Sequence, residues 1–175
     1  MTATVPRIVF AAIAIPMLSL TACNFSFSSG GGLDYDKLQT KLSDDIKKAY
    51  PDIVSEPPPV SCDKPDSPKP GDTFICTGDV NGQPVRIEVT VKDDQGNVDY
   101  KEMDLLYDLP TTAQGLDREI EKQMGFPVTV DCGEGLKSVA KGGTFTCQAT
   151  DENSVAKTVE VTATEFGKVD WRIVD

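Results

Sequence analysis

Residues 71–76 read Gly-Asp-Thr-Phe-Ile-Cys, and a similar stretch, Gly-Gly-Thr-Phe-Thr-Cys, returns at residues 142–147. Another cysteine precedes each stretch, Cys62 in the first case and Cys132 in the second. A repeat of roughly 70 residues indicates two copies of one small unit. Two further pairs of segments match in the same order, residues 87–91 with 159–163 and residues 96–101 with 167–172.

Each copy is predicted to be one helix followed by four strands. The first helix is expected to begin at Asp34 as its N-cap and to end at Tyr50, because Pro51 cannot continue it. The second is expected to begin at Thr111, in a capping box, and to stop at Gly125. The predicted strands are 60–62, 73–80, 84–92 and 97 to about 105 in the first copy, and 128–132, 143–150, 156–164 and 168–174 in the second.

Apolar and polar residues alternate in the third predicted strand of the first copy, where Ile87, Val89 and Val91 share one side. This period is typical of a sheet that is covered on one face, and the helix is the expected cover. Asn81-Gly82 predicts a two-residue hairpin turn. The predicted fold is therefore α+β, with two tandem small domains, each one helix packed on a four-stranded antiparallel sheet with one disulfide. The predicted domains span 34–104 and 111–175, and a short linker, 105–110, has leucines that suggest contact between them.

The N-terminal 22 residues are typical of a bacterial lipoprotein signal peptide. Arg7 precedes an apolar run at 8–20, and Leu-Thr-Ala-Cys at residues 20–23 resembles a lipobox, in which Cys23 receives a diacylglyceryl group. Residues 23–33 read as a flexible, glycine-rich tether. The expected location is the extracytoplasmic face of the cell membrane. The alternative is a plain secreted protein with a free thiol at Cys23.

The other four cysteines allow three pairings, and the repeat selects one of them. If each copy closes on itself, Cys62 pairs with Cys76 and Cys132 pairs with Cys147. A metal site is the competing interpretation, but the chain has no histidine and no Cys-x-x-Cys pair, and an exported chain meets an oxidising compartment. Structural disulfides without a metal or cofactor are therefore expected.

Charge and residue types narrow the classes of function. The net charge is 17 − 28 = −11, and without Arg7 it is 16 − 28 = −12, which disfavours nucleic acid as a partner. The absence of histidine excludes Ser-His and Cys-His nucleophile systems. Asp99 and Asp170 are the acidic pair that the repeat places in register, and we expect both on the solvent face of a strand opposite Lys or Arg. Residues 93–97 are interpreted as a hairpin turn in preference to a calcium loop. No catalytic residue is predicted.

The helix, the paired cysteines and the closing Gly-x-Val-x-aromatic pattern resemble the actinobacterial domain of unknown function numbered 4333, with copies at 34–104 and 111–175. The resemblance implies an envelope lipoprotein and carries over the two cysteine pairs, but that family has no agreed biochemical role. The architecture alone is also similar to the secreted β-lactamase inhibitory proteins.

We therefore expect a non-enzymatic binding or scaffolding module at the cell envelope. Its expected partners are the lipid bilayer, through the diacylglyceryl group on Cys23, and an envelope protein. One alternative is an inhibitor of an extracellular hydrolase, which an exposed row of aromatic residues on the open sheet faces would favour. The other is an enzyme that uses carboxylates, which would require at least two acids converging in one pocket.

Overall fold

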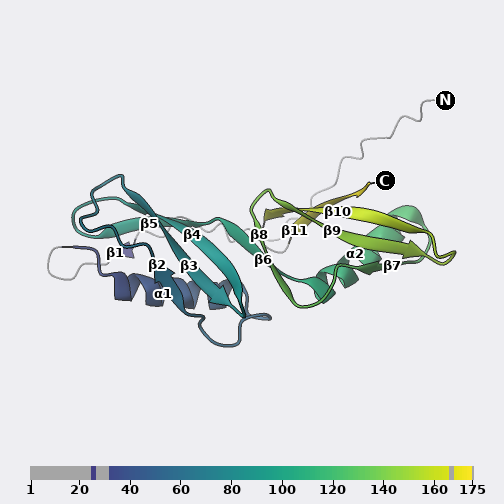
Figure 1. Ribbon diagram of the computed structural model, residues 1–175, viewed down its shortest axis with the longest axis horizontal. Helices are drawn as coiled ribbons and strands as arrows, with labels where there is room; N and C mark the ends of the chain where they lie inside the picture. Colours follow the sequence, from purple (N-terminus) through teal and green to yellow (C-terminus); the bar gives the residue numbers. More distant parts are fainter. Residues whose placement is uncertain (1–24, 27–31, 166–167, 175) are drawn as a thin grey trace, which may run out of the picture.

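The computed structural model describes residues 25–26, 32–165 and 168–174, and it contains two units that lie end to end along the longest axis (Figure 1). The predicted signal segment 1–22 and Cys23 lie outside the described residues. The first unit contains α1 (Tyr35–Ala49) and a sheet of order β1-β5-β4-β3-β2, whose strands are β1 (Phe25–Ser26), β2 (Val60–Cys62), β3 (Thr73–Val80), β4 (Gln83–Val91) and β5 (Asn97–Glu102). The second unit contains α2 (Leu109–Met124) and a sheet of order β11-β10-β9-β7, whose strands are β7 (Val128–Asp131), β9 (Thr144–Asp151), β10 (Ala156–Glu165) and β11 (Lys168–Val174).

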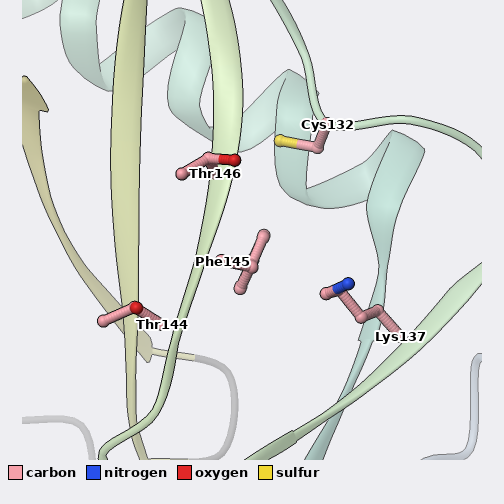
Figure 2. Close-up of a pocket in the computed structure, with 5 residues that line it drawn as sticks. All are labelled: Cys132, Lys137, Thr144, Phe145 and Thr146. Atoms are coloured by element: carbon pink, nitrogen blue, oxygen red, sulfur yellow. The ribbon is translucent and has the colours of Figure 1, made fainter.

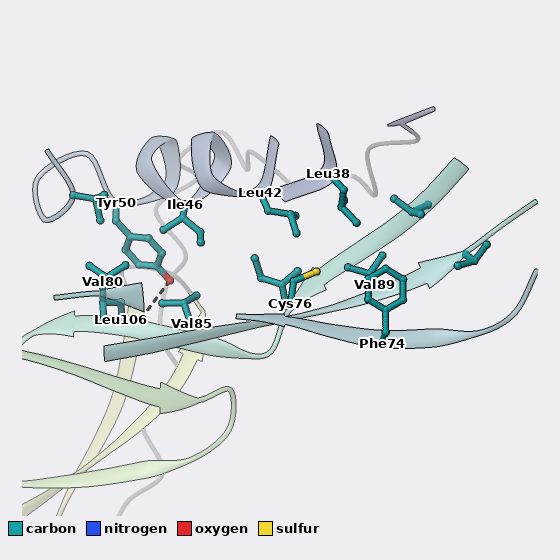
Figure 3. Close-up of a cluster of buried hydrophobic side chains, with 14 residues drawn as sticks. Leu38, Leu42, Ile46, Tyr50, Phe74, Cys76, Val80, Val85, Val89 and Leu106 are labelled. Carbon is teal, nitrogen blue, oxygen red and sulfur yellow. Dashed lines mark hydrogen bonds between the residues drawn. The ribbon is translucent and has the colours of Figure 1, made fainter. Parts of the chain in front are cut away.

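The first helix begins where the sequence predicts. Asp34 is the N-cap, and its side chain accepts a hydrogen bond from the Lys37 amide at 3.1 Å. That bond and the neighbouring Lys37 ammonium lower the pKa of Asp34. The apolar stripe of α1 faces the sheet and fills the first core, as Figure 3 shows for Leu38, Leu42 and Ile46.

The second helix starts earlier than the sequence predicts. Asp108 is its N-cap, since its carboxylate accepts a hydrogen bond from the Thr111 amide at 2.9 Å, and Pro110 occupies the first turn. The predicted capping box at Thr111 is therefore wrong, because this residue already lies inside the helix. The predicted stop is confirmed: Gly125 adopts φ 79°, the left-handed conformation that favours glycine.

The predicted strands are confirmed to within one or two residues, with one exception. Asn81 and Gly82 have φ values of 53° and 81°, so the predicted two-residue turn between β3 and β4 is also confirmed. The exception is the strand that was expected to run from Asn97 to about Leu105. It ends at Glu102, and the chain then enters a different sheet.

This different sheet is a two-stranded ribbon made of β6 (Asp104–Asp108) and β8 (Leu136–Ala140), hereafter the junction ribbon. The predicted linker at 105–110 is thus wrong, because its residues belong to β6 and to the first turn of α2. The sequence prediction also missed β8. The physical reason is that β6 pairs with a strand about 30 residues away, so no local turn signal announces it.

The junction ribbon contributes to both cores. Leu106 belongs to the first core, whereas Leu105 and Tyr107 belong to the second. Successive side chains of a strand point to opposite sides, so one strand can fill two neighbouring cores. The prediction that the leucines bring the units into contact is confirmed by this arrangement.

Two other features complete the framework. Disulfides join Cys62 to Cys76 and Cys132 to Cys147, as predicted from the repeat. In the first unit β1 adds a fifth strand, because Phe25 pairs with Val98 in β5. Part of the expected flexible tether is therefore paired strand, and the first sheet has one strand more than predicted.

Candidate functional site

The connection between the two units is held by a buried carboxylate. Asp104 is 3% exposed, and its Oδ2 accepts hydrogen bonds from the Arg86 amide at 2.9 Å and from Arg86 Nε at 2.7 Å. Its Oδ1 accepts a third from Arg86 Nη2 at 2.6 Å. Burial by itself would raise the pKa of Asp104, but the bonds to Arg86 outweigh it and lower the pKa. This carboxylate fixes the point at which the chain leaves β5 and enters β6.

A tyrosine at the end of α1 secures the same connection from the first core. Tyr50 is 1% exposed, and its hydroxyl accepts a hydrogen bond from the Leu106 amide at 3.3 Å, drawn as the dashed line in Figure 3. Burial raises the pKa of Tyr50 well above its ordinary value of 10, and the nearby Glu102 raises it further. The hydroxyl stays protonated over the whole physiological range.

Glu102, the last residue of β5, has an environment unlike that of the surface acids. Burial raises its pKa, the Lys141 ammonium opposes this effect, and the Asp45 carboxylate adds to it. A carboxyl group with a raised pKa is a feature of some catalytic acids, but structural clusters produce it as well. Glu102 lies two residues before Asp104, where the chain passes from β5 to β6.

A hollow of about 440 Å³ lies at the junction, between the loop after α1, β6 and the first turn of α2. Tyr107, one of the residues that line it, is 7% exposed, and its hydroxyl has no hydrogen-bond partner among the described residues. Burial raises the pKa of Tyr107 to about 12. The hollow is lined by Asp52, Ile53, Leu105, Leu106, Tyr107, Asp108, Thr111 and Thr112.

A second hollow, of about 330 Å³, lies in the second unit beside its disulfide. Figure 2 shows Phe145 lying centrally among the five residues that line it. Phe145 is 6% exposed and packs against the Tyr107 ring, with the ring centroids 5.3 Å apart. The side chains that line it are Cys132, Lys137, Thr144, Phe145 and Thr146.

The face of each sheet that points away from its helix is polar. On the first sheet, Lys101 Nζ lies 2.7 Å from Glu88 Oε1, and these two residues are directly opposite each other in β5 and β4. On the second sheet, exposed Thr144, Thr146 and Gln148 alternate with the buried residues of β9. Among the described residues of these two faces there is no row of exposed aromatic side chains.

The predicted acidic pair lies in two separate sheets. Asp99 is on β5, and its Oδ2 forms an ion pair with Lys92 Nζ at 3.2 Å. The prediction that Lys or Arg lies opposite these acids is wrong, because Thr90 is opposite Asp99 and Thr162 is opposite Asp170. Its Oδ1 is buried without a hydrogen-bond partner among the described residues. Asp170 is exposed on β11 of the other sheet. The structure therefore does not bring these two carboxylates together.

The turn at residues 93–97 is a hairpin turn, as predicted. The Asp93 carboxylate accepts hydrogen bonds from the amides of Gln95 and Asn97, both at 3.0 Å. The Asn97 side chain also donates to it, and these bonds lower the pKa of Asp93. The acidic side chain is thus engaged with its own turn.

The described part of the chain offers neither a metal cluster nor a membrane-spanning helix. No group of three or more His, Cys, Asp or Glu side chains is placed there to hold a metal ion. Across the same residues, no helix has the length and apolar content needed to cross a membrane.

Comparison with known proteins gives one family match. The model of the family described as Domain of unknown function (DUF4333) matches residues 18–96. No curated protein and no solved structure matches the chain. The family match covers the first disulfide and ends at the turn before β5, and it does not reach the second unit. Residues 18–96 of this chain are thus similar to a DUF4333 domain, a family whose description gives no function.

Proposed function

We propose that this protein is a lipid-anchored, extracytoplasmic lipoprotein whose two units act as a non-enzymatic binding or scaffolding module at the cell envelope. In this proposal Cys23 carries the diacylglyceryl group. Two features support it: the lipobox-like residues 20–23 and the use of the other four cysteines in two disulfides, which are typical of oxidising compartments.

The observation that carries the proposal is the pairing of β1 with β5. Phe25 and Ser26 form a strand of the first sheet and begin two residues after Cys23. Two extended residues reach about 7 Å, so an anchor on Cys23 would hold the first unit close to the bilayer. The junction ribbon would then hold the second unit farther along the same molecule, where it is presented to partners (Figure 1).

We further propose that the second unit is a diverged copy of the DUF4333-like first unit, as in actinobacterial envelope lipoproteins. In each unit a helix precedes four strands with the same order in the sheet, β5-β4-β3-β2 and β11-β10-β9-β7, and this supports the proposal. The disulfides, which span 14 and 15 residues, support it as well. A pair of cross-strand charges is also repeated, because Glu88 opposite Lys101 corresponds to Glu160 opposite Arg172. Glu88 and Glu160 are thus a second acidic pair in register, beside the predicted pair of Asp99 and Asp170.

Lipid attachment can be tested by metabolic labelling with an alkyne-bearing fatty acid. The full chain is expected to take up the label and to sediment with membranes, and Cys23→Ser is expected to lose both properties. As a matched control, the double variant Cys132→Ser/Cys147→Ser removes two other cysteines and should keep the label. A full chain with a free, unlabelled thiol at Cys23 would refute the anchor.

The binding role can be tested by photo-crosslinking on intact cells. A photoreactive residue at Thr146, on the exposed face of the second sheet, is expected to capture an envelope protein. The matched position is Thr90 on the corresponding face of the first sheet, which the proposal places nearer the bilayer. If neither position captures a protein, the binding module is the wrong description.

Inhibition of an extracellular hydrolase remains the alternative proposal. The exposed faces of the two sheets carry threonine and charged residues where that alternative called for aromatic ones, so the binding or scaffolding module is favoured. Addition of the full chain to a panel of extracellular hydrolases separates the two, because only an inhibitor reduces their activity at equal molar amounts.

A further inference from the structure

The second sheet ends in a strand that the described chain leaves open on one side. β11 pairs with β10 and is the last strand of its sheet. The corresponding strand of the first unit, β5, is partly covered by β1. An edge strand presents a row of unpaired backbone N–H and C=O groups that can pair with another strand. β11 is therefore a place where a further strand can add.

From Lys168 to Ile173, the side chains of β11 alternate between an exposed face and a half-buried face. Val169 and Trp171 are half-buried and pack against the second core. The Trp171 indole also donates a hydrogen bond from Nε1 to Glu119 Oε2 on α2, at 3.0 Å. The other face carries three exposed charged residues, Lys168, Asp170 and Arg172. An added strand would cover the half-buried edge and would meet these charges on the outer face.

The order of charged residues along β11 is complementary to that of a second copy of β11 that runs antiparallel to it. Because paired residues must lie on the same face, a two-fold axis between two copies of β11 passes through a pair of identical residues. With Trp171 at the axis, all seven residues of β11 are paired, and Asp170 lies opposite the partner's Arg172 on both sides of the axis. Val169 then lies opposite the partner's Ile173 on the helix side of the sheet.

Neighbouring registers do not match in this way. With Asp170 at the axis, Asp170 faces its own copy and Lys168 faces the partner's Arg172, so like charges oppose each other. With Arg172 at the axis, two guanidinium groups meet. Like charges directly opposite each other in a sheet are destabilising. Among these registers, the one centred on Trp171 combines the longest pairing with opposite charges.

The charges already present beside β11 continue the pattern. Arg172 Nη2 lies 2.6 Å from Glu160 Oε1, and Glu160 is directly opposite Arg172 in β10. In the Trp171-centred pair, three charged residues would lie side by side on the outer face across neighbouring strands. In order they are Glu160, Arg172 and the partner's Asp170, so that each charge lies next to one of opposite sign. We propose that two copies of this chain associate through antiparallel pairing of β11 with β11, centred on Trp171, to form one continuous sheet.

The test is the mass of the full chain, purified in detergent, measured by sedimentation equilibrium over a concentration series. A single edge-to-edge contact is small, so association is expected to be weak, and the series extends to about 1 mM. The full chain should approach the mass of two copies. Asp170→Arg places an arginine opposite the partner's Arg172 on both sides of the axis, and it leaves the ion pair of Glu160 with Arg172 intact. It should therefore weaken association at least about tenfold.

A mixture supplies the specific control. Arg172→Asp by itself should also associate more weakly than the unchanged chain, because it places an acid opposite the partner's Asp170. Equal parts of the two variants should associate again, since opposite charges then face each other across the axis. Asp99→Arg makes the same change on the corresponding strand β5 and should associate like the unchanged chain. Melting curves verify that each variant is folded. If Arg172→Asp does not fold, the comparison of Asp170→Arg with the unchanged chain decides the test.

Three results would overturn the proposal. The first is a full chain that stays at the mass of one copy over the whole series. The second is Asp170→Arg associating as well as the unchanged chain, which would place the contact elsewhere, for example on the N-terminal segment of a neighbouring copy. The third is a mixture of two folded variants that fails to restore association.

Discussion

Replacement of Asp104 by alanine tests how the two units are connected. The substitution removes the acceptor of three hydrogen bonds from Arg86, one from its amide and two from its guanidinium group. It also removes a charge that is almost completely buried at the start of β6. We expect Asp104→Ala to destabilise the protein and to loosen β6 before the rest of either unit.

The expected size of the effect follows from the exposure of the two partners. Breaking a fully buried ion pair costs about 3–5 kcal/mol. Here the Arg86 side chain is 46% exposed, so its guanidinium group can return to water when the carboxylate is lost. The Arg86 amide still loses a bond to a charged acceptor, which is worth about 1.5–3 kcal/mol. The free energy of unfolding should therefore fall by about 2–3 kcal/mol.

Urea unfolding followed by far-ultraviolet circular dichroism measures this change. A loss of about 2–3 kcal/mol should lower the midpoint by about 1–2 M. Glu88→Ala is the matched control, because it removes an ion pair on the exposed face of the first sheet, with Lys101 71% exposed, and should cost about 0.5 kcal/mol or less. Equal effects of the two substitutions would refute the reasoning.

The pH dependence gives a second check on the same pair. The pKa of Asp104 is lowered in the folded protein, so its contribution is present above its ordinary value of 3.8 and is lost as pH falls through the lowered pKa. The difference in stability between the unchanged protein and Asp104→Ala should therefore be constant near neutral pH and disappear in strong acid. A difference that grows on acidification would contradict the assigned role.

Four further substitutions test other parts of the fold, one expected to destabilise it and three expected to stabilise it or leave its stability unchanged. Gly78→Ala should destabilise the protein by about 1–3 kcal/mol, because the new methyl group would collide with Ile46 in the first core. Gly115→Ala on α2 meets no atom within 4 Å and should stabilise the protein by about 0.5–1 kcal/mol. Thermal melting of both variants measures the two effects. Glu102→Gln should stabilise at neutral pH, and this gain should fade as pH falls toward 4.5, because the raised pKa of the carboxyl group means that its charged form is unfavourable in the folded state; urea unfolding at several pH values measures it. Tyr107→Phe removes a buried hydroxyl without a partner among the described residues, so its urea midpoint should stay equal or rise, and a clear fall would show that the hydroxyl is bonded.

Much of each unit could be predicted because its signals are local. The stripe of α1, the alternation in β4 and the turn at Asn81-Gly82 each lie within a few residues. The repeat also allowed the long-range cysteine pairing to be predicted, Cys62 with Cys76 and Cys132 with Cys147. Local periodicity and an internal repeat therefore sufficed for the two sheets and their disulfides.

The junction ribbon shows what local signals cannot provide. Leu105, Leu106 and Tyr107 lack the alternation of a half-exposed strand because a core lies on each side of them. The same residues read equally well as an apolar linker. The buried pair of Arg86 with Asp104 gave no signal either, since both residues look like ordinary surface charges in the sequence. Which charged residues form a buried ion pair depends on contacts between segments that are distant in the sequence.

One error had a readable cause. Asp108 stands directly before Leu109-Pro110, and an acidic cap followed by proline in the first turn is a helix-start pattern. The capping-box pattern that begins three residues later, at Thr111, obscured it. The two patterns are adjacent, at residues 108–110 and 111–114, and the Asp108 carboxylate is the group that accepts a hydrogen bond from the Thr111 amide.

The central claim is that β6 belongs to both units and joins two disulfide-closed folds into one body. Hydrogen exchange of the full chain, read by mass spectrometry on peptides that cover residues 104–108, tests it most directly. The structure predicts that these amides exchange as slowly as those of β4 and β10, because β6 pairs with β8 and contributes to both cores. Exchange as fast as in the loop between β2 and β3, with both sheets still protected, would show that this segment is the flexible linker that the structure excludes.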